Sequence, residues 1–528
     1  MGLFQKKSSR RNQVRKNMPL DGLANLNRLI STEVIVSILI WLLFVVVSIP
    51  ILSFEFIRDQ QRLALLQSTI LVVLISLGGA WYILHYQRRI LRNHGRAFAM
   101  ASLLILTLAA TKLGVLLWQR TLWATGGAVV VGIILTIAFD QRFAIGMSMF
   151  YCLLGGLAGG GTTIGIGQVR PYELTDLGLL LTMASGTLTC CFSLREIRTR
   201  MKLINVSVAA GAAVFAAAVV VGFMAEGEMP TARVYANAGW HAATTLLVGL
   251  LIQALLPIIE RTFRIATGMT LLDYSDANQP LLKRLAMEAP GTFSHSLFIG
   301  SIAEAAAQAI GRNGLLCRVG AYYHDIGKIN KPGYFVENEM GSVSRHKELS
   351  PAMSQLIIVG HVKDGIEMAK EYGLPAVLRQ FIETHHGTTL VEPFYNEAKK
   401  KHNANGKVGK AKEAPPSKSA FRYAGPRPRT KEAGIVMLSD AVEGAVRTLQ
   451  DATPAKIEVV VHNIAMRRLQ DGQFDECELS FRELGQIEAS IAKTLAGHYH
   501  GRIPYPTRPD EPAEGRALMT GQAKTQNQ

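Results

Sequence analysis

The C-terminal half of this 528-residue chain contains histidines and carboxylates of the kinds that bind metal ions. An adjacent pair, His324 and Asp325, opens the string HDIGK, whose lysine is Lys328. One such pair carries little information, because a half-buried histidine is more often hydrogen-bonded to a backbone carbonyl than bound to a metal. The other members of the set are His295, His361, His385, His386 and Asp440.

Taken together, these imidazoles and two carboxylates are a sufficient ligand set for two divalent metal ions. Neighbouring residues on a helix point about 100° apart. On a helix, His324 would bind one ion while the short carboxylate of Asp325 reaches between two. Lys328 follows by one turn, where its ammonium would contact a phosphate oxygen or form a solvated helix end.

Helices are expected to position these residues. Helical periodicity covers residues 294–310, 315–328, 349–372, 374–385, 432–449, 454–470 and 480–497, and no run of alternating β-branched residues occurs among them. We therefore predict an all-α domain over residues 286–506, preceded by a linker helix over 260–285. Residues 396–420 are rich in Lys, Gly, Asn and Pro and are expected to form a mobile loop, and residues 507–528 a disordered tail.

The N-terminal half is apolar enough to raise the mean hydropathy of the whole chain to +0.19. After a basic leader over residues 1–32, a transmembrane region of about eight helices is predicted over 33–259, because eight segments are long enough to cross ~30 Å of hydrocarbon. These segments are 33–53, 66–86, 98–118, 122–139, 143–166, 175–193, 203–224 and 238–259. His241 in the last of them is expected to face the bundle interior, with a ligand role as an alternative.

The charges indicate how the chain is placed in the membrane. Strongly basic loops alternate with loops of mixed sign, which predicts a multi-pass protein of the cell (inner or plasma) membrane with its N-terminus and C-terminal domain in the cytoplasm. The same loops, with the lysine-rich segment 396–420, explain the net charge of +16. No aromatic residues are interleaved with those lysines, so no nucleic acid polymer is expected as a partner. The five cysteines form neither a disulfide framework nor a metal knuckle.

The order of the histidines and aspartates resembles that of the HD superfamily of metal-dependent phosphohydrolases. The strings APGTFSHSL, RVGAYYHDIGK, FVENE, HVKDG, ETHHGTT, YAGPRP, VMLSDAVEGAVR and RIPYP are similar to those of the 7TM-HD family of bacterial cyclic-di-AMP phosphodiesterases. Members of that family carry one crossing, a large extracytoplasmic domain, seven more crossings and a cytoplasmic HD domain. Only residues 54–65 separate the first two crossings here, so the external domain is expected to be missing.

The resemblance implies a site and an activity. The implied activity is hydrolysis of cyclic di-AMP to linear pApA by water that two divalent ions activate, Fe or Mn being suited to a site without thiolates. Asp325 and Lys328 would act in catalysis, and Lys328 also in substrate binding. A lipid bilayer is the second expected partner, and a homodimer is left open. The implied metal ligands are His295, His324, Asp325, His361, His385 and Asp440, with His386 as a further ligand or a hydrogen-bond donor to one.

Other functions remain as alternatives. An HD phosphohydrolase can act on cyclic di-GMP or guanosine tetraphosphate, although the cyclic-di-GMP class carries a glycine-tyrosine-proline signature where this chain continues GTTLVEPF. A non-catalytic membrane receptor with an HD-like fold would be expected to lose ligand residues, and all six are present here. The surroundings of His346 depart from the family pattern, so its role is open.

Overall fold

The computed structural model describes residues 32–500 except 88–89, 91–92, 119–120, 161–175, 195–196, 227–231, 264, 340–343, 406–414 and 450. The predicted leader before residue 32, the tail and the middle of the expected 396–420 loop therefore lie outside the described residues. The described chain is helical, and its β pairing is limited to one isolated bridge between Leu390 and Arg422. The predicted all-α fold class is confirmed. The chain divides into two compact units, Met1–Thr270 and Leu271–Gln528.

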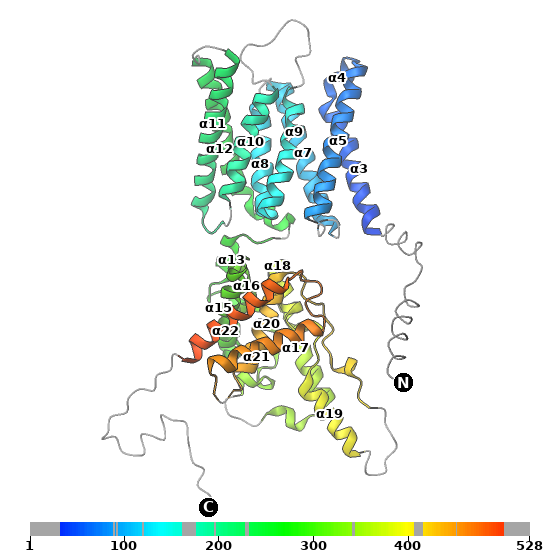
Figure 1. Ribbon diagram of the computed structural model, residues 1–528, viewed down its shortest axis with the longest axis vertical. Coiled ribbons are helices and arrows are strands. Elements are labelled where there is room, and N and C mark those ends of the chain that lie inside the picture. The colour runs from blue at the N-terminus through cyan, green and yellow to red at the C-terminus, as the bar shows by residue number, and fades with distance from the viewer. Residues whose placement is uncertain are drawn as a thin grey trace, which may run out of the picture. The chain divides into compact units, whose positions relative to one another are not determined.

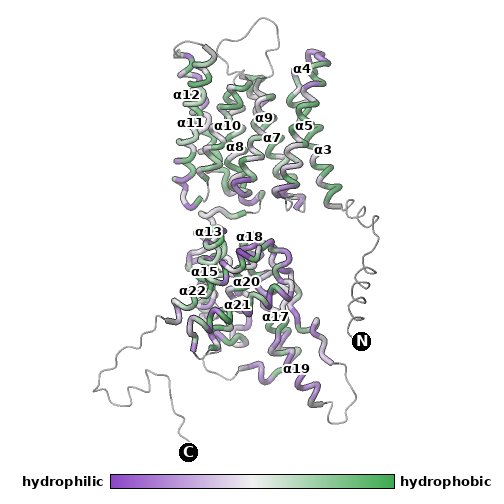
Figure 2. The backbone as a smooth tube through the Cα atoms, in the orientation of Figure 1, coloured by the Kyte–Doolittle hydropathy of each residue, from purple (hydrophilic) through white to green (hydrophobic). Residues whose placement is uncertain are grey.

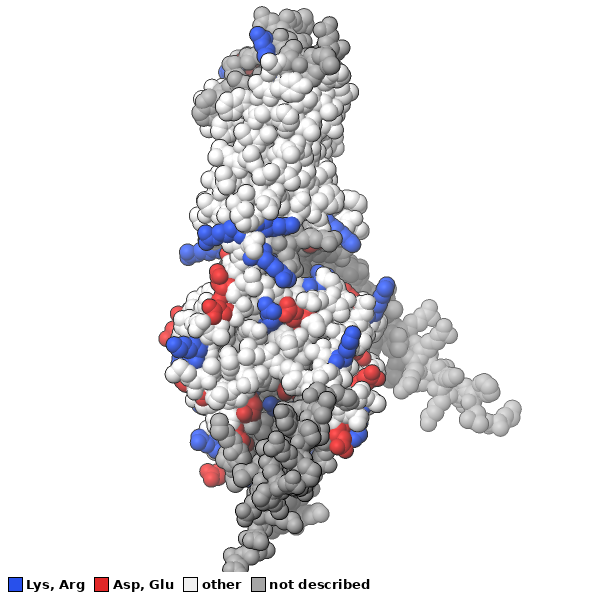
Figure 3. Space-filling view, turned by 90° about the vertical axis from the view of Figure 1, so that its left-hand side faces the viewer, with Lys and Arg blue, Asp and Glu red and all other residues white. Residues whose placement is uncertain are grey.

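The first unit is a bundle of apolar helices (Figures 1 and 2). They are α3 (Thr32–Leu52), α5 (Arg62–Tyr86), α7 (His94–Trp118), α8 (Leu122–Ala138), α9 (Gln141–Gly160), α10 (Asp176–Ser193), α11 (Arg200–Glu226) and α12 (Ala232–Phe263). Six of them are long and apolar enough to cross a membrane, whereas α8 and α10 are shorter. The face of this unit seen in Figure 3 carries almost no charge along its length.

A histidine of the bundle turns inward, as expected for an ionisable group at membrane depth. His241 is fully buried, and its Nδ1 lies 2.8 Å from the Thr125 hydroxyl oxygen, so the expectation that it faces the interior is confirmed. Between α3 and α5 lies the single short helix α4 (Phe54–Arg58). The large external domain, expected to be missing at this point, is therefore absent there.

The second unit is a helical domain whose core is formed by α15, α16, α20, α21 and α22 (Figure 1). Its longer helices are α14 (Pro280–Glu288), α15 (Pro290–Ala309), α16 (Gly314–Tyr323), α17 (Pro351–Glu371), α18 (Ala376–Thr384), α19 (Glu392–Asn405), α20 (Lys431–Val446), α21 (Pro454–Gln470) and α22 (Phe481–His500). The short α13 (Gly268–Tyr274) comes before them. The short 3-10 helices are η1 (Ile326–Asn330), η2 (Pro332–Tyr334), η3 (Val336–Asn338), η4 (Arg345–Glu348) and η5 (Lys418–Phe421).

Two expected segments differ from the structure. Residues 260–285 are not one linker helix but the end of α12, the short α13 and the start of α14. The Glu260 carboxylate accepts a hydrogen bond from the Thr267 backbone N–H, and Pro280 begins α14 because it has no N–H to donate to a preceding turn. Residues 396–405 belong to α19 rather than to a loop. The Tyr395 ring packs on Phe421, which anchors that helix despite its polar sequence.

Candidate metal centre

The adjacent pair His324 and Asp325 lies at the end of a helix rather than within one. The helix expected over 315–328 ends at Tyr323, and the chain tightens into η1 from Ile326. His324 caps α16, and Asp325 has left the α-helical conformation. Both side chains are almost completely buried. The turn aims the Asp325 carboxylate away from its own helix, toward the histidines of other helices.

Asp325 lies between two groups of side chains that could hold a metal ion. One group combines it with His361, His385 and His386, and the other with His295, His324 and Asp440. Within each group the ligand atoms all lie within 4.8 Å of one another. The seven residues that the sequence singles out as metal ligands are thus brought together from α15, α16, α17, α18 and α20 and the turns that follow them.

The two oxygens of Asp325 divide between the groups. Oδ1 lies 3.4 Å from Nε2 of both His361 and His385. Oδ2 lies 3.2 Å from Nε2 of His324 and 3.8 Å from Nε2 of His295. A carboxylate in this position is a bridge between two neighbouring cation sites.

The backbone sets which ring nitrogen faces the centre. Nδ1 of His324 lies 2.6 Å from the Ala321 carbonyl oxygen. Nδ1 of His385 lies 2.9 Å from the Ile382 carbonyl oxygen. His361 repeats the arrangement, with Nδ1 2.5 Å from the Ile358 oxygen. Because Nδ1–H donates to the carbonyl three residues earlier, Nε2 is the nitrogen that faces the centre in each ring, and it carries a lone pair whenever the ring is neutral.

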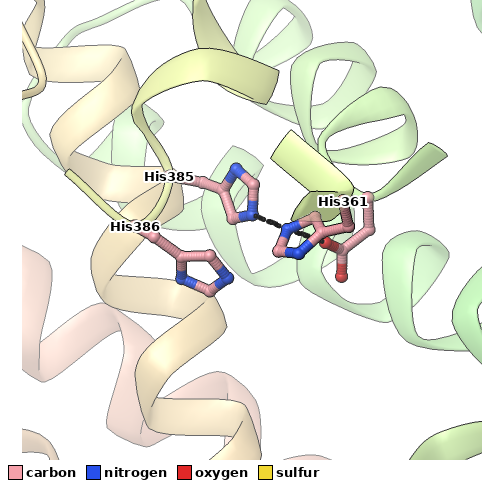
Figure 4. A group of neighbouring side chains, drawn as sticks. His361, His385 and His386 are labelled. Atoms are coloured by element: carbon pink, nitrogen blue, oxygen red, sulfur yellow. Dashed lines mark hydrogen bonds and ion pairs between the residues drawn. The ribbon is translucent and has the colours of Figure 1, made fainter. Parts of the chain in front are cut away.

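These lone pairs fit a cation. Nε2 of His361 and Nε2 of His385 face each other at 3.1 Å, with His386 beside them (Figure 4). Two acceptors cannot hydrogen-bond to each other, and both lie against the Asp325 carboxylate. Nε2 of His324 and Oδ1 of Asp325 are also buried without a hydrogen-bond partner. Buried acceptors of this kind are satisfied by a metal ion.

The ionisation of His361 and Asp325 agrees with this fit, whereas His324 carries a proton near pH 7. Burial lowers the pKa of His361 to about 3, so the ring is neutral near pH 7. Burial opposes the charge on Asp325, but His324 and Lys328 hold the pKa of that carboxyl well below its usual range. For His324 burial lowers the pKa, and the Asp325 charge outweighs it and raises the pKa to about 10. A proton and a metal ion therefore compete for Nε2 of His324.

Lys328 is held by two carboxylates. Its Nζ lies 2.7 Å from Asp325 Oδ2 and 2.7 Å from Glu337 Oε1. Thr292 donates its hydroxyl to the same Glu337 oxygen. An ammonium has three protons, so one remains for a further acceptor. In this position Lys328 keeps the bridging carboxylate ionised and oriented.

Three residues near the centre were not predicted from the sequence as members of the site. Glu443 places Oε2 2.9 Å from Nδ1 of His295, and both atoms are buried. It follows Asp440 by three residues, so helical spacing was a signal that could have found it. Tyr423 packs its ring on His386, with 4.3 Å between the ring centroids. Burial lowers the pKa of Arg468, and the charge of Asp440 opposes this shift. Tyr423 begins the string YAGPRP, which was a signal that could have found it, whereas no local pattern marks Arg468.

His346 lies outside both ligand groups. Its Nε2 is 2.8 Å from the Tyr334 carbonyl oxygen, and its ring packs against Tyr334 and Phe394. These contacts give it a packing role, which joins η4 to η2 and α19.

Known proteins share both units of the chain. Residues 62–267 match the family described as a 7TM receptor with an intracellular HD hydrolase, and residues 292–445 match the HD domain family. The cyclic-di-AMP phosphodiesterase PgpH of Bacillus subtilis is 42% identical over 279 residues, which are 51% of this chain and 38% of that protein. PgpH of Listeria monocytogenes is 42% identical over 276 residues, which are 52% of this chain and 36% of that protein.

Two solved structures with similar sequences are of one isolated domain. Crystal structures of the L. monocytogenes PgpH HD domain, alone and in complex with cyclic di-AMP, are 42% and 43% identical to this chain. They cover 42% and 43% of this chain and 100% of their own, with a TM-score of 0.39. The chain spans less than two fifths of the length of these two curated relatives.

Proposed function

Because the chain belongs to the family of 7TM receptors with an intracellular HD hydrolase, we propose that it is a membrane-anchored, metal-dependent phosphodiesterase that hydrolyses cyclic di-AMP to linear pApA. The observation that carries this proposal is the position of Asp325, whose two oxygens face two separate ligand groups. The substrate is supported by the names of the similar phosphodiesterases and by the HD-domain complex with cyclic di-AMP.

In this proposal the side chains of the second unit bind two divalent metal ions. His361, His385, His386 and Asp325 hold one divalent ion, and His295, His324, Asp440 and the same Asp325 hold the other. Two such ions, Fe or Mn for a ligand set of imidazoles and carboxylates, activate water and neutralise charge on the phosphoryl group.

Lys328 and the exposed ligands act on the substrate. Lys328 keeps Asp325 ionised and directs its third N–H toward a phosphate oxygen. His386 and Asp440 are the most exposed of the seven ligands, with 22% and 14% of their side chains accessible, so the substrate approaches on their side.

The test is a hydrolysis assay with the full-length protein in detergent or lipid nanodiscs, loaded with Mn²⁺ or Fe²⁺. We expect conversion of cyclic di-AMP to pApA, loss of that activity on chelation, and recovery when metal is returned. Hydrolysis of cyclic di-GMP or guanosine tetraphosphate alone would assign another substrate. Metal-independent binding without turnover would make the protein a receptor. Light scattering of the same sample tests the homodimer.

The proposed location is the cell membrane, with the N-terminus and the second unit in the cytoplasm, on the basis of the charges in the loops. Reporter fusions after Arg200 and after Gly501 are expected to report the cytoplasm, and a fusion at Gly227 the opposite side. The reverse pattern would separate the catalytic domain from a cytoplasmic nucleotide and would contradict the proposed function.

A further inference from the structure

The open side of the metal centre has an arginine beside it. Asp440 and His386 form that side, because the side chains of the other ligands are at most 6% exposed. Tyr423 packs on His386, and the residue before it, Arg422, donates a 2.7 Å hydrogen bond to Asp471 at the end of α21, the helix that carries Arg468. Arg468 is thus a cation next to the path by which a substrate reaches the ligands.

The guanidinium of Arg468 has no anion to pair with among the described residues. Its Nε is buried and lacks a hydrogen-bond partner. The carboxylate of Asp471 acts on it but is already engaged, with 3.0 and 2.7 Å hydrogen bonds from Arg422 and another from Gln473. Asp440 lies 3.1 Å from His295 and belongs to the metal centre.

The neighbouring arginine shows the contrast. Arg467, one residue earlier on α21, is largely exposed and forms an ion pair with Glu392. Arg468 is half-buried, and this burial lowers the pKa of its guanidinium because the charge is partly removed from water. A guanidinium that pairs with no carboxylate of the described residues is a candidate site for a phosphate or carboxylate of a ligand, since its planar donors match such anions.

A substrate with two phosphates meets this arrangement. The phosphate to be cleaved lies against the two ligand groups, where Lys328 already supplies a cation. We propose that Arg468 binds the second, uncleaved phosphate of the substrate, so that the site selects cyclic dinucleotides over compounds with a single phosphodiester. This inference rests on the proposed function and names the group that recognises the part of the substrate distant from the reaction.

The experiment compares Arg468→Gln with the matched control Arg467→Gln in the full-length protein. The substrates are cyclic di-AMP and bis(p-nitrophenyl) phosphate, which has one phosphodiester and no second phosphate. Loss of a hydrogen-bonded charge pair is expected to raise KM for cyclic di-AMP about 10- to 100-fold in Arg468→Gln. Its kcat/KM for bis(p-nitrophenyl) phosphate and its metal content should equal those of the wild type. Arg468→Lys should restore part of the loss, and Arg467→Gln should behave as the wild type.

The outcomes separate this inference from the proposed function. An equal loss on both substrates, or no loss on either, would overturn the role of Arg468 while leaving cyclic-di-AMP hydrolysis intact. If the wild type does not hydrolyse cyclic di-AMP, the proposed function fails, and inhibition of bis(p-nitrophenyl) phosphate hydrolysis by cyclic dinucleotides becomes the measurement. Inhibition that Arg468→Gln weakens would still support the second-phosphate site. Inhibition that it leaves unchanged, or none in the wild type, would overturn it.

Discussion

Replacing Asp325 with alanine is expected to abolish phosphodiester hydrolysis and to remove metal from the protein while leaving it folded. Its two oxygens are the only ligand atoms common to both groups of the described centre. Loss of even an outer partner of a metal ligand typically costs 10- to 100-fold in affinity or activity, so loss of a shared ligand should exceed about 100-fold. The measurements are metal per chain by elemental analysis and turnover of cyclic di-AMP.

The fold should survive this change for a structural reason. Lys328 keeps its second carboxylate, Glu337, at 2.7 Å, so the substitution does not leave a buried ammonium without a partner. Circular dichroism should therefore remain helical. Asp451→Ala is the matched control, because the Asp451 carboxylate is 80% exposed and its nearest cation, Lys456, is 3.8 Å away. Wild-type turnover in Asp325→Ala would rule out the shared-ligand assignment.

Gly327→Ala is expected to destabilise the second unit and to disrupt metal binding without altering any ligand. A Cβ at residue 327 would lie 1.9 Å from the His361 carbonyl oxygen and 2.5 Å from the Gly365 nitrogen. These are backbone atoms of α17, so they yield only if the helix moves. Overpacking of this kind costs about 3 kcal/mol in the free energy of unfolding, and moving α17 displaces His361 from Asp325.

The measurement is the apparent melting temperature together with metal content, both in detergent. For a domain of this size, about 3 kcal/mol corresponds to a fall of about 6 to 12 °C. Gly485→Ala in α22 is the control, because its Cβ would meet nothing within 4 Å and alanine favours a helix. A Gly327→Ala protein that melts and binds metal like the wild type would show that η1 and α17 are not in the close contact seen here.

The sequence by itself determined the class of the fold and identified the residues that the structure groups as candidate metal ligands. Apolar runs and helical periodicity are local properties, so a membrane bundle followed by a helical domain could be predicted without knowing any contact. The strings around His295, His324 and His385 are also local, and they carried the resemblance to HD hydrolases. All seven expected ligands lie in one of the two groups.

Local patterns failed where neighbouring elements compete with propensity. Helical periodicity continued past Tyr323, but the close approach of Gly327 to α17 requires the tighter turn of η1. The sequence of residues 396–405 is polar, but packing of Tyr395 on Phe421 holds it as a helix. In both cases a contact with a distant segment outweighs the preference of the local sequence.

Only the tertiary structure decided how the ligands are divided and what surrounds them. The two oxygens of Asp325 face different histidines because α15, α17, α18 and α20 pack around the end of α16, an arrangement that depends on the whole core. The same packing pairs Lys328 with Glu337 and buries Nε of Arg468 without a hydrogen-bond partner among the described residues. Spacing along a chain specifies neighbours within a helix, whereas partners more than a hundred residues apart are specified by the burial of many side chains at once.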